Sequence, residues 1–199
     1  MKQLIIKILL TVVIIFLAYL VVDSIRKPVE FKKSKQQREQ VVIKRLIDIR
    51  DGQQLYKNFN GKYMGSWDTL IDFLQTAEIP IVKITQDPED TTMTVKIRDT
   101  IGYMNAADSL YHKRFKVSNI KYVPFTEDKI FDMDAGIITK GSVKVPVFEA
   151  KAHYNDILNG LDEQLVLNLV EERKALDKYP GLKVGSMSEP STDGNWELK

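Results

Sequence analysis

The chain contains no cysteine, and only two of its 199 residues are histidine. Without cysteine it can form no disulfide, no thiolate zinc site and no thiol nucleophile. His112 stands in a basic run with Lys113 and Arg114, and His153 lies far from it in sequence. We therefore expect both histidines at the surface, no metal site, no cofactor and no Ser/His or Cys/His catalysis.

Other catalytic signatures are missing as well. There is no glycine-rich phosphate loop and no Gly-x-Ser-x-Gly elbow. Asp132-x-Asp134-x-Gly136 is spaced like the start of a calcium loop, but the third acidic ligand and the closing glutamate are absent. A turn leading into a strand is the better interpretation. The sequence therefore predicts a protein that is not an enzyme.

The chain also lacks an excess of one charge. It has 29 basic and 27 acidic residues, which leaves a net charge of +2. Nothing in this balance indicates a nucleic-acid partner. The hydrophobic fraction of 44% is sufficient for the core of one domain.

What the chain does have is an apolar N-terminus. After a short tail of residues 1–3, residues 4–22 contain Lys7 as their only charge. As a helix they would measure about 28 Å, close to the roughly 30 Å hydrocarbon core of a bilayer. A cleaved secretory signal is the alternative, but Tyr19–Ser24 has bulky residues where cleavage needs small ones. We expect a retained transmembrane helix with the lipid bilayer as a partner.

The sidedness of this anchor is open to two interpretations. Only Lys2, Lys7 and the amino terminus precede the span, and the positive-inside rule alone would place the following domain in the cytoplasm. A very short N-terminal tail is typical of signal anchors that export the domain. We expect a single-pass protein of the inner (cytoplasmic) membrane with an extracytoplasmic domain. The basic residues after the span, which could contact anionic head groups or be a solvated helix face, are Arg26, Lys27, Lys32, Lys33, Lys35 and Arg38.

Residues 23–59 are predicted to form a juxtamembrane stalk helix, which Pro28 is expected to kink or interrupt. A strong helix-forming run from Lys35 to Gln40 leads into a mostly apolar stripe with steps of four and three residues. Such a stripe suits either a coiled-coil contact with a partner protein or packing on the chain's own domain. The candidate partner-contact residues, with Gln53 between the last two, are Val42, Leu46, Ile49 and Tyr56.

Residues 60–199 are predicted to form a globular domain, so the fold class is α+β with a mainly antiparallel sheet and packed helices. Gly61 ends the stalk helix, and Ser66 caps a second helix over 67–74. Strands are expected at 79–85 and 91–98, which would form a hairpin around a turn at 87–90. Further strands are expected at 114–123 and within 135–150, the last divided by a turn at 140–142. Pro146 indicates an edge strand or a bulge.

The C-terminal part returns to helix and then to strand. Asp162 is expected to cap a helix over 163–178, and Pro180-Gly181 ends it. Residues 182–187 are expected to form a short last strand.

Two resemblances rest on particular residues. Ile49–Tyr56, Gly61–Tyr63 and Ser66–Leu70 resemble the end of the long N-terminal helix in bacterial type IV pilins and pseudopilins. This chain departs from them because it has no leader ending in glycine and no glutamate near the start of its apolar segment. More broadly it is similar to uncharacterised single-span envelope proteins of Bacteroidetes, notably in Leu182–Met187 and Gly194–Glu197.

The second resemblance implies no activity, and the first implies a filament or secretion apparatus. The expected function is a membrane-anchored structural or assembly subunit of an envelope complex of the pilus or secretion type, with protein partners. The alternative is an anchored binding module for an envelope ligand such as a lipid, a glycan or an unfolded protein.

Overall fold

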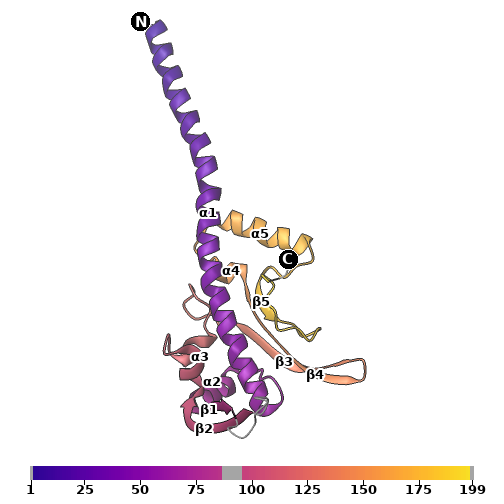
Figure 1. The fold of residues 1–199 in the computed structure, drawn as a ribbon. Coiled ribbons are helices and arrows are strands. Elements are labelled where there is room, and N and C mark those ends of the chain that lie inside the picture. Colours follow the sequence, from indigo (N-terminus) through magenta and orange to yellow (C-terminus); the bar gives the residue numbers. More distant parts are fainter. Residues whose placement is uncertain (1, 87–95, 198–199) are drawn as a thin grey trace.

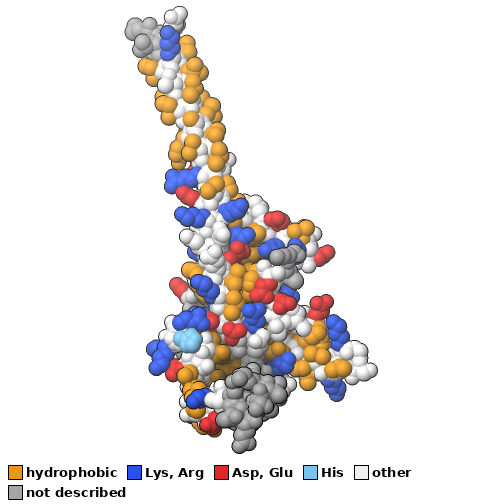
Figure 2. All heavy atoms as spheres, in the orientation of Figure 1, with side chains coloured by type: hydrophobic (Ala, Val, Ile, Leu, Met, Phe, Trp, Pro, Cys, Tyr) orange, Lys and Arg blue, Asp and Glu red, His pale blue; other side chains and the backbone are white. Residues whose placement is uncertain are grey.

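One helix, α1 (Lys2–Asn60), runs from the N-terminus to the far end of the domain (Figure 1). The structure is a computed structural model that describes residues 2–86 and 96–197. The 59 residues of α1 extend about 88 Å at 1.5 Å per residue. The described apolar side chains in its first half are exposed (Figure 2). By length and composition α1 contains one candidate membrane span.

The expected interruption at Pro28 does not occur: α1 continues through Pro28 without a break. Proline removes one backbone donor, but its φ is compatible with a helix. Two ion pairs lie in this segment, each between residues one helical turn apart: Asp23 with Lys27 at 2.8 Å, and Arg26 with Glu30 at 2.6 Å. Exposed pairs at this spacing favour the helix weakly. A continuous helix therefore joins the candidate span to the domain.

The second half of α1 is part of the domain core and not a free stalk. From Phe31 onward most of its apolar side chains pack against residues from the rest of the chain, while Val41 and Phe59 stay exposed. Position 60 therefore marks the end of a helix, while the hydrophobic core includes residues on both sides of it.

The chain turns back after α1 through a buried amide. Gln53 is fully buried, donates to the Met64 carbonyl and accepts from the Met64 N–H at 3.0 Å. α2 (Trp67–Thr76) then begins as expected after Ser66, although the Ser66 hydroxyl makes no cap hydrogen bond. Trp67 Nε1 donates to the Phe131 carbonyl at 3.0 Å. These bonds hold α2 against α1 and the start of the main sheet.

The first predicted hairpin is confirmed. β1 (Glu78–Gln86) pairs antiparallel with β2 (Lys96–Asn105), and this two-stranded sheet is separate from the other strands. β2 extends beyond the predicted end at residue 98. The expected turn at residues 87–90 and the start of the predicted strand 91–98 lie outside the described residues.

The strand predicted for residues 114–123 is wrong. After α3 (Ala106–Tyr111) this segment forms the 3₁₀ helix η1 (Val117–Lys121), and Tyr122 makes only an isolated bridge to Ile130. Arg45 donates to the Asn119 carbonyl at 2.6 Å, and its guanidinium lies 4.3 Å from the Phe115 ring centroid. A contact from α1 thus takes up a backbone acceptor of this segment.

The main sheet has the order β3-β4-β5 and is antiparallel throughout. β3 (Asp132–Lys140) and β4 (Val143–His153) form the second predicted hairpin, with Gly141 at a φ of 62° in its turn. β5 (Gly181–Gly185) pairs with just one part of β4, Glu149–His153. The outer half of the hairpin therefore extends from the domain as a two-stranded arm (Figure 1).

The position of Pro146 follows from this arrangement. β4 is the middle strand of the sheet, but Pro146 lies in its outer half, which pairs with β3 alone. A proline is tolerated where one side of a strand has no ladder partner. The expectation of edge-like surroundings therefore holds, although β4 itself is central.

Two helices complete the domain. α4 (Tyr154–Ile157) follows β4 directly, and α5 (Glu163–Ala175) begins after Asp162, whose side chain accepts from the Leu165 N–H at 3.0 Å. α5 ends three residues before the predicted 178. It buries Val166 and Val170. In Figure 1 it extends away from α1 on the side of the domain nearest the N-terminal half of α1.

Candidate interaction sites

The predicted partner-contact stripe lies inside the chain's own core. Val42, Leu46 and Ile49 are 0% exposed and Tyr56 is 7% exposed. The Tyr56 ring packs edge-on against Phe73 of α2, with centroids 4.9 Å apart. A partner could reach these side chains only if the core opened. Of the two interpretations of the stripe, the structure has the helix packed on its own domain.

The candidate surface that the sequence analysis did not single out is the apolar ribbon, which we define as β1 and β2. Neighbouring residues of a strand point to opposite faces, so Ile81 and Val82 lie on different faces. A register shift between them leaves Ile101 without a paired residue. Apolar side chains are therefore exposed on both faces of the apolar ribbon. They are 39–67% exposed and comprise Ile81, Val82, Ile84, Ile101, Tyr103 and Met104.

This exposure is unusual for a two-stranded sheet. An isolated hairpin is only marginally stable in water, and it normally packs one apolar face on a core. The apolar ribbon contacts α2 and α3 where its strands meet these helices. The sequence signal for it is Ile79-Pro80-Ile81-Val82, in which apolar residues occupy both parities of one strand.

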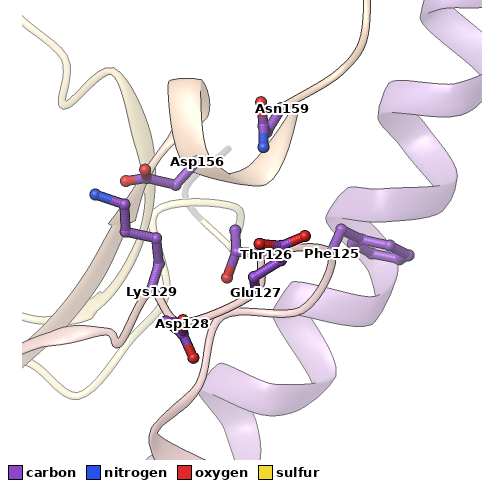
Figure 3. Close-up of a pocket in the computed structure, with 7 residues that line it drawn as sticks. All are labelled: Phe125, Thr126, Glu127, Asp128, Lys129, Asp156 and Asn159. Carbon is purple, nitrogen blue, oxygen red and sulfur yellow. The ribbon is translucent and has the colours of Figure 1, made fainter.

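A second candidate is the hollow beside α4, a cavity of about 590 Å³ lined by residues 125–129 and by Asp156 and Asn159 (Figure 3). Phe125 has a φ of 69°, which is uncommon for a bulky residue. In Figure 3 its ring is directed toward α1 and away from Asp156. Apart from Phe125, every residue that lines the hollow carries a carboxylate, amide, hydroxyl or ammonium group.

Arg38 of α1 fixes one wall of this hollow. Its guanidinium lies 5.1 Å from the Phe125 ring centroid and donates to the carbonyls of Ile157 and Asn159, at 3.2 and 2.7 Å. Arg38 is one of the basic residues that the sequence placed in the juxtamembrane group. Its contacts show that it belongs to the domain.

A half-buried ion pair joins α1 to the segment after α3. Arg114 donates to Asp48 at 2.9 Å, and the Tyr111 hydroxyl donates to the Asp48 carbonyl at 3.0 Å. Burial raises the pKa of Asp48 against the opposing effect of Arg114, and burial also raises the pKa of Tyr111. Residue spacing alone did not point to this contact between Asp48, Tyr111 and Arg114. Its bonds are all internal, which gives it a structural role.

Charged side chains also cross the main sheet. Glu149 accepts from Lys151 at 3.1 Å and from Lys183 at 2.9 Å, and Lys151 lies 3.3 Å from Asp132. Burial alone would raise the pKa of Glu149, but the hydrogen bonds from the two lysines lower it overall. The calcium-like residues Asp132, Asp134 and Gly136 are consecutive alternate positions of β3. They belong to a strand and do not curve around a common centre.

The two histidines have different surroundings. His112 is exposed and has a φ of 47° at the end of α3. His153 is half-buried, and its Nδ1 accepts from the Asn155 N–H at 3.1 Å at the start of α4. Burial lowers the pKa of His153. Within residues 2–86 and 96–197, no three His, Cys, Asp or Glu side chains are grouped so that they could hold a metal ion.

No family model matches the chain, and no curated protein or solved structure is significantly similar to it.

Proposed function

We propose that the protein is a structural or assembly subunit of an envelope complex, anchored in the inner membrane by residues 4–22 with its domain on the extracytoplasmic side. The exposed apolar ribbon carries this proposal. Large apolar patches on a protein surface usually mark contacts with another molecule. The charged networks around Asp48 and Glu149 are satisfied internally and support no competing catalytic role.

The apolar ribbon lies far from the bilayer in this arrangement. Figure 1 places β1 and β2 at the end of the domain opposite the N-terminus. From Val22 to Tyr56, which is close to α2, the helix axis rises about 50 Å. Because α1 is continuous, the anchor holds the apolar ribbon at a set distance from the membrane.

The occupant that fits the apolar ribbon best is a second copy of this chain. Two copies anchored in one membrane hold their apolar ribbons at the same height, so a two-fold axis along the membrane normal brings like surfaces together. The strands have nine and ten residues. One face of the two strands holds about half of these residues, so it would supply part of the 20–30 residues that a stable interface uses on each side. The resemblance to pilins and pseudopilins is in keeping with a structural subunit.

Photo-crosslinking of the full-length protein in native membranes tests this proposal. The crosslinking residue replaces Tyr103, which is 67% exposed on the apolar ribbon, or in the control Leu176, which is 57% exposed after α5. We expect a product of twice the monomer mass from position 103 only. Adding Ile84→Asp to the same chain should abolish it.

The other outcomes are equally informative. A product of a different mass from position 103 would replace the second copy by another protein, and no specific product would overturn the assembly role. The anchor is tested separately: the protein should keep its N-terminus, by intact mass, and resist alkaline extraction. A mature N-terminus between residues 18 and 30 would show a cleaved signal instead.

The hollow beside α4 favours a second function, that of an anchored binding module. Its polar lining would suit a glycan or the head group of a lipid. Native mass spectrometry of the purified protein would then show a bound small molecule that Asn159→Ala and Asp156→Ala remove. Unchanged occupancy in both variants would exclude the hollow as its site.

A further inference from the structure

The apolar surface of α1 extends further toward the domain on one flank than on the other. Beyond Val22, Ile25 and Val29 are 63% and 62% exposed. With 3.6 residues per turn they share one flank of the helix. Asp23 and Lys27 lie at similar heights on the opposite flank and form an ion pair at 2.8 Å. On the Ile25 flank, the apolar surface therefore ends later in the sequence than on the opposite flank.

The other end of the apolar segment is offset in the same direction. Lys7 precedes Ile25 by 18 residues, which is five helical turns, so the two share a flank. The opposite flank at this level carries Leu9, which is apolar and exposed. On the Ile25 flank the apolar surface thus begins later as well as ending later.

We propose that α1 crosses the bilayer at a marked tilt, with Ile25 and Val29 in contact with lipid acyl chains. This inference rests on the membrane anchoring in the proposed function. At both ends, the apolar surface on the Ile25 flank is shifted toward the C-terminus relative to the opposite flank. Such a surface matches the flat hydrocarbon layer of a bilayer only when the helix is tilted. The occupant is the bilayer itself, because this surface is continuous with the apolar segment through Val22.

The size of the offset sets the degree of tilt. Val29 lies about 9 Å along the axis beyond Asp23, the first polar residue on the opposite flank, and a helix with side chains is about 10–12 Å wide. The tilt then lies toward the upper end of the 0–40° range seen for membrane helices. Arg26 lies beside this surface, pairs with Glu30, and is long enough to reach the head groups.

The tilt also sets how the domain meets the membrane. Lys27, Glu30 and Asp162 line a shallow hollow of about 300 Å³ where α1 meets the start of α5. On this flank the hydrocarbon boundary recedes from the domain. These charged groups therefore stay among water and head groups, while the opposite flank enters the hydrocarbon.

Because the chain has no cysteine, single cysteines can be introduced for spin labelling without removing native ones. The full-length protein would be reconstituted in phosphatidylcholine vesicles with one-quarter phosphatidylglycerol. Four variants form two matched pairs at neighbouring heights: Ser24→Cys with Ile25→Cys, and Lys27→Cys with Val29→Cys. Collision rates of the nitroxide with oxygen and with a water-soluble nickel chelate report its depth.

We expect a depth order that does not follow residue number. Labels at 25 and 29 should collide several-fold less with the nickel chelate, and more with oxygen, than labels at 24 and 27. Nickel access at 29 equal to or above that at 27 would overturn the tilt and leave the anchor intact. If all four labels, and a further label at Leu17→Cys, were open to nickel, the anchoring itself would fail.

Discussion

Replacing Leu46 by alanine separates a core role of α1 from a partner-contact role. Leu46 is 0% exposed and lies in a core shared with α2 and the main sheet. Truncating a buried leucine to alanine costs about 2–5 kcal/mol, from lost burial and the cavity that remains. For a chain of this size that corresponds to a fall in Tm of roughly 4–20 °C. A partner contact would leave the unfolding of the single chain almost unchanged.

The measurement is thermal unfolding of the full-length protein in detergent micelles. Fluorescence follows Trp67 and Trp196, which both pack against the core. Val41→Ala is the matched control, because Val41 is on the same helix and 44% exposed, and its loss should change stability by about 0.5 kcal/mol or less. Equal transition temperatures for Leu46→Ala and Val41→Ala would refute the assignment of this stripe to the core.

Two further predictions concern the main sheet. Gly185→Ala should lower the Tm far more than Gly141→Ala. Both glycines have positive φ, which costs about 1–2 kcal/mol for alanine, but a Cβ at 185 would also clash with the Phe148 carbonyl oxygen, while the space at 141 is open. Equal losses would contradict the packing at 185. Because the folded pKa of Glu149 is lowered, its contribution to stability is fully present above pH 4.5 and is lost as the pH falls through the folded value. Urea unfolding should therefore show a smaller loss of stability below pH 4.5 in Glu149→Gln than in the wild type. If the free energy of unfolding fell equally with pH in both proteins, Glu149 would not contribute to the pH dependence.

Local patterns were sufficient for most elements. The hairpin turn at Gly141, the helix after Asp162 and the start of α2 after Ser66 each follow from the residue types at those positions. The segment 114–123 was not predictable in this way. Its alternation favours a strand, but the Asn119 carbonyl accepts from Arg45 of α1, 74 residues away in the chain. The hydrogen bond from Arg45 is a long-range contact, and the alternation of residue types within the segment does not reveal it.

The candidate surfaces divide in the same manner. The stripe from Val42 to Tyr56 was identified as buried from its spacing, but spacing does not tell which surface covers it. Hydrophobic burial is non-directional, so a leucine side chain is stabilised equally by its own chain or by a partner. The apolar ribbon shows the opposite case, since its residues suit a buried strand and yet Ile84 and Tyr103 are left exposed.

The sequence by itself determined the apolar N-terminal helix, the α+β class and the order of most elements, because periodicity and turn residues act over a few neighbouring positions. Only the tertiary structure decided that the stalk belongs to the core, that Pro28 leaves α1 unbroken, and that most apolar side chains of the apolar ribbon stay exposed in the described chain. These outcomes depend on contacts between segments distant in sequence. The free energy of each contact comes from both surfaces together, and a pattern along one segment describes only one of them.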